Sequence, residues 1–260
     1  MEWILLLGAG IVGGVINSIA GGGSFFTFPA LMFVGLPPVV ANATNTFAAC
    51  AGYISGTYGF KKDIVQHTDK LIPIILWSLL GGGLGAYLLL NVDESVFVEA
   101  IPWLLLFATL LFLYGQQLNQ WFASFAKRKG LSPIWATTTL AICLVLVSAY
   151  GGFFNAGLGV IVLSYLVLAG YTDINQMNGL KLLVSSSVSL VAIVIFVMDG
   201  SIDWLRGTVV MLGTLIGGYA AARLSRNVAQ QHVKMFVAFS SALMTAYFFY
   251  DTYLTDTVIH

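Results

Sequence analysis

Charge is what this sequence lacks most. Only 8% of its 260 residues are Asp, Glu, Lys or Arg, whereas soluble domains carry about a quarter. So few charged side chains cannot cover a water-facing surface, and nucleic-acid binding needs basic clusters that a chain of zero net charge does not supply. The mean hydropathy is +0.91, so the composition predicts that lipid surrounds most of the protein.

Cysteine and histidine are also scarce. Cys50 and Cys143 lie in apolar stretches without CxxC spacing, which is typical of small buried side chains. The three histidines lie in basic loops or at the end of the chain, so no His, Cys, Asp or Glu cluster inside an apolar run offers a metal site. Because a membrane serine protease also needs a general base at depth, we expect no metal, no cofactor and no enzymatic activity.

The sequence contains long runs without charged residues. Residues 3–60 and 130–172 contain no Asp, Glu, Lys, Arg or His, and a spanning helix needs roughly 20 apolar residues. Punctuation residues divide the chain into ten apolar segments: 3–20, 24–36, 38–59, 71–91, 97–115, 133–150, 154–170, 174–198, 204–222 and 233–250. This pattern predicts an all-α, polytopic integral membrane protein.

Two of these segments differ from full spans. Segment 24–36 would form a helix of about 20 Å, which is too short to cross a hydrocarbon core of roughly 30 Å. We expect it to dip into the membrane and return, and the stretch 154–170 to do likewise. The sequence therefore predicts about eight spanning helices plus two short re-entrant or broken helices.

The loop charges predict an orientation. Lys and Arg gather in loops 60–70, 116–132 and 223–234, whereas loops 92–96 and 199–203 carry only acids. Basic loops stay on the cytoplasmic side, so we expect a multi-pass protein of the cell inner (plasma) membrane with both termini on the outer side. No Lys or Arg precedes the first apolar stretch, which predicts a first membrane segment rather than a cleaved signal peptide.

An internal duplication is visible. GGVINS (13–18) recurs as GGFFNA (151–156), each followed by a glycine-rich break, and Gly81-xxx-Gly85 recurs as Gly213-xxx-Gly217. The first copy begins outside and the second inside, so residues 1–126 and 127–260 are predicted to be inverted repeats that form one transport domain. Inverted repeats are typical of secondary transporters, which bind substrate near the midplane where helices break.

The breaks supply the first site candidates. Irregular backbone at membrane depth is tolerated only where it faces protein or a water-filled cavity, and helix starts favour an anion. We expect Gly21, Gly22, Gly23 and Ser24 in one break, and Gly157 and Gly159 in the other, to line a cavity. The glycines of Gly10-xxx-Gly14, Gly52-xxx-Gly56 and Gly81-xxx-Gly85 are expected to allow close helix packing.

Polar side chains inside the apolar segments complete the candidate site. Lys181 lies about two turns inside its segment, where an intramembrane lysine costs roughly 3 kcal/mol. A bound anion would offset that cost; the alternatives are a snorkelling lysine or one neutralised by Asp173, which is itself expected to be a helix cap. The full set of candidate substrate-binding residues is Asn17, Gly21, Gly22, Gly23, Ser24, Asn42, Asn45, Asn155, Gly157, Gly159, Asn178 and Lys181.

These motifs resemble a known family. The run GGVINSIAGGGSFFTFPALMFVGLPPVVANATNT and its weaker second copy GGFFNAGLGVIVLSYLVLAGYTDINQMNGLKLL are similar to the sulfite exporter TauE/SafE family, also called the toluene sulfonate uptake permease family. The resemblance covers essentially the whole chain. It implies an inner-membrane carrier, built from duplicated halves, for sulfite, sulfoacetate or other organosulfonates. The second copy departs from the first where Leu158 replaces the middle glycine.

The leading hypothesis is a secondary transporter of small sulfur-containing anions, with Asn17, Asn45, Asn155 and Lys181 contacting the anion. Its expected partners are the small anionic substrate and the lipid bilayer, with no nucleic acid and a possible homo-oligomer. A passive anion channel and a membrane scaffold without flux are the alternatives.

Overall fold

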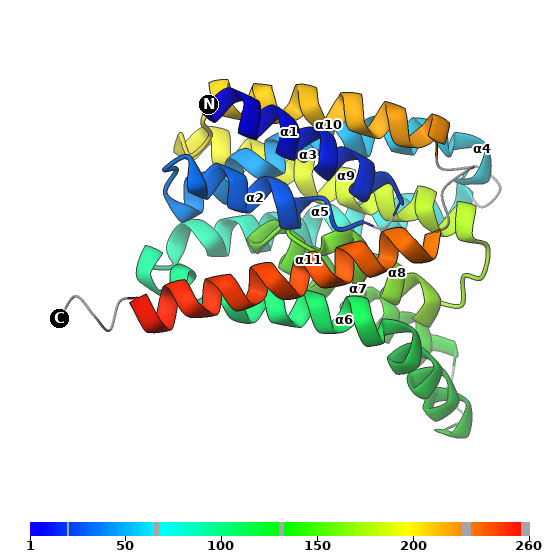
Figure 1. The fold of residues 1–260 in the computed structure, drawn as a ribbon. Coiled ribbons are helices and arrows are strands. Elements are labelled where there is room, and N and C mark those ends of the chain that lie inside the picture. Colours follow the sequence, from blue (N-terminus) through cyan, green and yellow to red (C-terminus); the bar gives the residue numbers. More distant parts are fainter. Residues whose placement is uncertain (20, 65–67, 130–132, 225–229, 256–260) are drawn as a thin grey trace.

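A computed structural model describes residues 1–19, 21–64, 68–129, 133–224 and 230–255. Within these ranges the chain is helical and has no strand, which confirms the all-α prediction (Figure 1). The helices are α1 (Glu2–Ile19), α2 (Ser24–Phe33), α3 (Pro38–Gly59), α4 (Lys61–Ile64), α5 (Thr68–Asn91), α6 (Glu94–Lys129), α7 (Pro133–Phe153), α8 (Leu158–Leu168), α9 (Ile174–Asp199), α10 (Trp204–Leu224) and α11 (Gln230–Tyr250), followed by a π-helical turn (Asp251–Thr255).

Local sequence signals explain several helix ends. Pro38 occupies the first turn of α3, where a missing N–H costs nothing. The Asp173 carboxylate accepts a hydrogen bond of 2.8 Å from the Gln176 N–H at the start of α9, so the expected cap is confirmed. Gly35 and Gly170 follow the two short helices α2 and α8 with φ of +87° and +90°, a conformation that glycine adopts without steric cost.

The two predicted short elements are present. Helix α2 has 10 residues and α8 has 11, which is about 15 Å of helix each and too little to cross a hydrocarbon core. After the break, α2 runs back toward the end of the bundle at which α1 begins (Figure 1). Three helical stretches are long and apolar enough to span a membrane among the described residues, namely Leu71–Asn91, Glu94–Tyr114 and Ile174–Asp199. A total of eight spans stays a prediction.

One predicted loop is mostly helix. The segment 116–132 was expected to connect two spans, but α6 continues without interruption to Lys129 and has 36 residues. Residues 116–129 contain neither glycine nor proline, so nothing stops the helix after its apolar part ends. The three basic residues at 127–129 also suit the negative end of the helix dipole.

Two helix pairs make unusually close contact. A Cβ atom added at Gly14 of α1 would lie 2.3 Å from the Thr214 carbonyl oxygen of α10, and one at Gly85 of α5 would lie 2.0 Å from the Ala149 carbonyl oxygen of α7. The expected role in close helix packing is therefore confirmed for Gly14 and Gly85. Gly52 differs, because a Cβ there would meet nothing within 4 Å.

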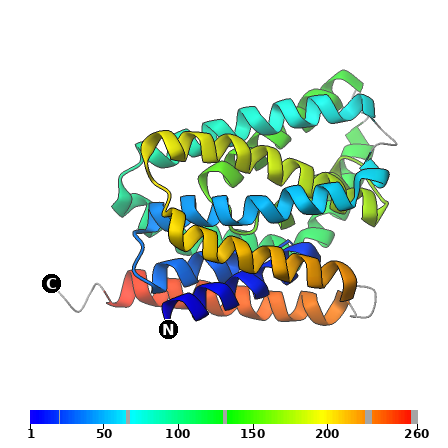
Figure 2. The same ribbon diagram turned by 90° about the horizontal axis from the view of Figure 1, so that it is seen from above.

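The packing order is symmetric about the centre of the bundle. Figure 2 shows α5, α9, α3, α10 and α1 side by side in this order, and α7 packs on the far side of α5. Each close pair therefore joins one helix from each predicted repeat: α1 with α10, and α5 with α7. This arrangement is what an inverted duplication would produce, while the boundary between residues 126 and 127 stays a prediction.

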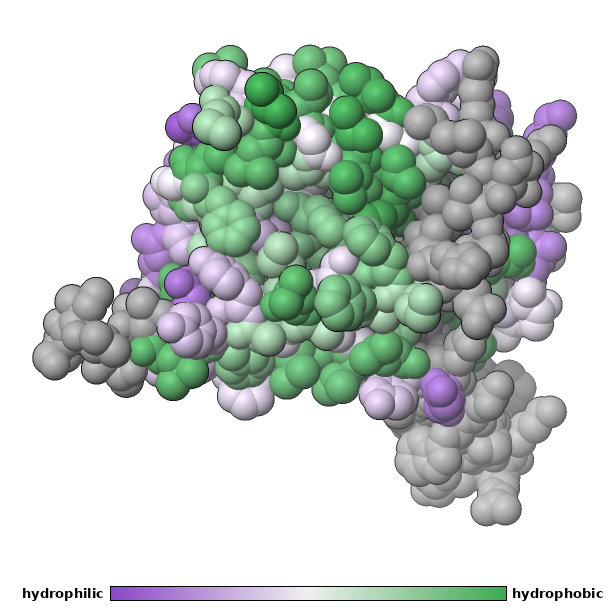
Figure 3. Space-filling model, in the orientation of Figure 1, coloured by the Kyte–Doolittle hydropathy of each residue, from purple (hydrophilic) through white to green (hydrophobic). Residues whose placement is uncertain are grey.

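The outer surface is apolar over the middle of the bundle. On α5, Leu76, Leu80, Leu84 and Leu88 follow at intervals of four residues and are about half exposed. Figure 3 shows hydrophobic residues across the middle of the visible face and hydrophilic residues toward two ends. Such a belt suits contact with acyl chains.

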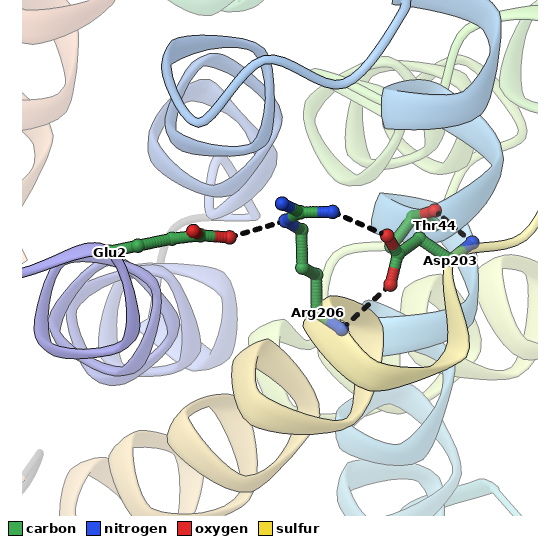
Figure 4. A network of polar contacts seen from close by, with 4 residues as sticks. All are labelled: Glu2, Thr44, Asp203 and Arg206. Carbon is green, nitrogen blue, oxygen red and sulfur yellow. Dashed lines mark hydrogen bonds and ion pairs between the residues drawn. The ribbon is translucent and has the colours of Figure 1, made fainter.

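Polar contacts close one end of the bundle. Arg206 at the start of α10 pairs with Glu2 of α1 and, at 2.8 Å, with Asp203. The Asp203 N–H donates to the Thr44 hydroxyl of α3 at 3.0 Å (Figure 4). The N-terminus and the end of α11 lie at this same end, and α4 lies at the opposite one (Figure 1).

Candidate functional site

The break between α1 and α2 opens onto a pocket. The space between its atoms is about 360 Å³, its open mouth included. Among the described residues no charged side chain lines it, and its polar atoms come from amide and hydroxyl groups and the backbone. The lining residues are Gly13, Gly14, Asn17, Ser18, Gly23, Ser24, Thr27, Ala49, Gly52, Leu182 and Thr214.

The glycines of the two breaks have different surroundings. Gly23 lines the pocket. Gly21 has φ of +85° and lies against Gly159 of the second break, where an added Cβ would meet the Gly21 carbonyl oxygen at 2.8 Å. Added Cβ atoms at Gly22 and Gly157 would meet Val237 and Ala108. The structure therefore brings the two breaks together, but of these glycines only Gly23 belongs to the pocket.

Asn155, in the break between α7 and α8, is the centre of a buried hydrogen-bond network. Its Oδ1 accepts hydrogen bonds from the Ser24 hydroxyl at 3.3 Å and the Tyr53 hydroxyl at 2.9 Å. Its Nδ2 donates to Ser189 at 3.4 Å, and its backbone N–H donates to Asn42 Oδ1 at 3.3 Å. Three of the predicted residues, Ser24, Asn42 and Asn155, thus meet at the pocket wall.

Asn45 lies one layer behind the pocket. Its Oδ1 accepts a hydrogen bond from Thr27, which lines the pocket. Its Nδ2 is buried and has no hydrogen-bond partner among the described residues. A buried donor without a partner is costly, so this amide retains a hydrogen that another acceptor could take.

Lys181 lies apart from the pocket. Its side chain is 1% exposed, and its Nζ donates to Asn178 Oδ1 at 3.2 Å. No ion pair with Lys181 occurs within the part of the chain that the structure describes, and the Asp173 carboxylate instead caps α9. Neither a snorkelling lysine nor one neutralised by Asp173 fits this geometry. The next residue, Leu182, does line the pocket.

The sequence did not predict Tyr53 and Ser189 as partners of Asn155, or Thr27 as the partner of Asn45. A helical spacing could have found Tyr53, because positions 42, 45, 46, 49 and 53 follow the i, i+3, i+4 pattern of one helix face. The other members of that face are polar or small, so a large aromatic hydroxyl on it has a polar partner to find. Thr27 and Ser189 carry no comparable signal.

Comparison with known proteins identifies the chain. The family model described as "Sulfite exporter TauE/SafE" matches residues 6–248. This chain belongs to the sulfite exporter TauE/SafE family. A protein of Haemophilus influenzae named "Probable membrane transporter protein" is 29% identical over 95% of this chain and 94% of its own length. "Probable membrane transporter protein YfcA" of Escherichia coli K12 is 30% identical over 96% and 91%. No solved structure matches.

Membership in the TauE/SafE family makes the chain a membrane transporter. The match extends over both predicted repeats, so both belong to the family region. The two glycine-rich breaks, the pocket and the Asn155 network all lie within it.

Proposed function

We propose that this protein is a secondary transporter of small sulfur-containing anions, such as sulfite, sulfoacetate or another organosulfonate, across the inner membrane, and that it catalyses no reaction. The observation that carries the proposal is the neutral, donor-rich pocket at the break between α1 and α2. Asn17 and Ser24 line it, and Gly23 and Ser24 place the start of α2 there. The positive end of a helix dipole favours an anion.

A neutral pocket suits a carrier. Hydrogen bonds from amides and hydroxyls recognise oxyanion oxygens, and a lining whose described residues carry no charge keeps the anion easy to release. The remaining predicted residues act from behind the lining: Asn45 through Thr27, Asn155 through Ser24, and Lys181 as a buried positive charge next to Leu182. A buried charge without an acidic partner is stabilised when an anion approaches.

The predicted orientation completes the proposal. The N-terminus and the end of α11 lie opposite α4, which carries Lys61 and Lys62 (Figure 1). We therefore place α4 in the cytoplasm and both chain ends on the outer side.

Flux measurements in proteoliposomes test this function. We expect saturable uptake of sulfite by the wild type, little uptake by Lys181→Ala, and a strong reduction by Asn17→Ala. Lys61→Ala and Asn91→Ala are matched controls, because both residues are exposed and outside the pocket. Normal sulfite flux in Lys181→Ala would remove that residue from the site. Non-saturating currents would favour a channel, and no flux of any sulfur oxyanion would favour a scaffold.

A further inference from the structure

The orientation of the Asn155 amide suggests a role other than direct binding of an anion. Its carbonyl oxygen faces the pocket wall and accepts two hydroxyl hydrogens, while its NH₂ group faces Ser189. A carbonyl oxygen cannot donate to an anion. It can, however, occupy the position that an oxygen of an anion would take between the same two donors.

We propose that Asn155 Oδ1 is a placeholder for a substrate oxygen, and that an oxyanion entering the pocket takes the hydroxyl hydrogens of Ser24 and Tyr53 from it. Tyr53 is then a substrate-binding residue. This inference rests on the proposed transport of a sulfur oxyanion and names two of the donors that would recognise it.

Position supports the exchange. Ser24 lines the pocket, and its hydroxyl shares the acceptor Asn155 Oδ1 with the Tyr53 hydroxyl. Tyr53 is 3% exposed, so its hydroxyl is shielded from competing solvent. Hydroxyl hydrogens rotate freely to suit an acceptor, and a charged oxygen is a stronger acceptor than an amide carbonyl.

The pocket hydroxyls of Ser18 and Thr214 are held more firmly. Ser18 donates to the Gly14 carbonyl at 3.0 Å, and Thr214 donates to the Ala48 carbonyl at 3.0 Å. Both acceptors are backbone atoms of packed helices. Ser24 and Tyr53 instead donate to a side chain at a helix end, which can turn away when an anion replaces it.

The exchange also links binding to movement. The Ser24 and Tyr53 contacts connect α2 and α3 of the first predicted repeat to the break between α7 and α8 in the second. Transfer of both hydrogens to the anion removes these two connections and leaves the two hydrogen bonds that Asn42 makes with the backbone of Phe153 and Asn155. Substrate binding would therefore loosen the contact between the repeats at the pocket.

Two tyrosine variants test the inference. Binding of sulfite to the purified protein in detergent is measured by calorimetry for the wild type, Tyr53→Phe and Tyr150→Phe. The Tyr150 hydroxyl is the matched control, because it donates to the backbone carbonyls of Leu104 and Ala156 instead of the pocket network. We expect Tyr53→Phe to raise the Kd for sulfite at least tenfold and Tyr150→Phe to leave it within about twofold.

Asn155→Leu separates a placeholder from a ligand. Leucine keeps the side-chain volume and removes the acceptor, so we expect sulfite to bind at least as tightly as in the wild type while flux falls. A Kd raised as much as in Tyr53→Phe would make Asn155 a direct ligand and overturn the exchange. If Asn155→Leu does not fold, an unchanged Kd in Tyr53→Phe still overturns it. A wild type that binds no sulfur oxyanion would instead refute the proposed function itself.

Discussion

Replacing Gly85 with alanine tests whether the close helix pairs hold the bundle together. The added Cβ would lie 2.0 Å from the Ala149 carbonyl oxygen and 2.7 Å from the Phe153 nitrogen. Both are backbone atoms, so no side chain can turn away, and α5 and α7 must separate by about 1 Å. Overpacking of this kind costs about 1–3 kcal/mol.

Gly83→Ala is the matched control on the same helix. Its Cβ would meet the nearest atom, Val191 Cγ2, at 3.4 Å, an ordinary contact, and alanine favours a helix by up to about 1 kcal/mol over glycine. Thermal unfolding of the detergent-solubilised protein measures both variants. At about 2–4 °C per kcal/mol, we expect Gly85→Ala to unfold several degrees below the wild type, with Gly83→Ala unchanged or higher. Equal melting temperatures for the two variants would refute the backbone-contact argument.

Two further predictions concern helix starts. Partial burial raises the pKa of Asp203, but hydrogen bonds from the backbone and guanidinium of Arg206, with its charge, outweigh this and hold that pKa below its usual value. The ionised carboxylate thus stabilises the fold above its unfolded-state pKa of about 4 and loses this effect as pH falls through its lower folded-state pKa. Asp203→Asn should melt below the wild type at pH 7, and the difference in melting temperature should shrink as the pH falls below about 4; a difference that stays constant with pH would contradict this. Asp173→Ala should lower the free energy of unfolding by about 1 kcal/mol, because the α9 cap is lost. Asp173→Ser should keep most of that stability, because serine can also cap a helix. Chemical denaturation of both variants in detergent measures the difference.

The sequence predicts the helices well because their signals are local. Uncharged length, glycine breaks and the Asp173 cap each act within a few residues of the element they define. The end of α6 was missed since the change from apolar to basic residues at 116–129 ends a membrane segment without ending a helix. Membrane solvation and helix formation are separate requirements there.

The site was predicted only in part, because its contacts join distant segments. Asn17, Ser24 and Gly23 could be placed at the pocket from the motif that contains them. The meeting of Tyr53 with Asn155, 102 residues apart, depends on how α3 crosses the break between α7 and α8. The packing of complete helices decides where α3 crosses this break, and a short sequence motif does not predict that packing.

The two closest helix pairs each join one predicted repeat to the other. Because α1 lies backbone to backbone against α10, and α5 against α7, we expect the two helices of each pair to move together. Each helix pair that moves as a unit would therefore contain one helix from each predicted repeat. We expect that residues 1–126 expressed alone do not form these pairs, because α10 and α7 belong to the other predicted repeat.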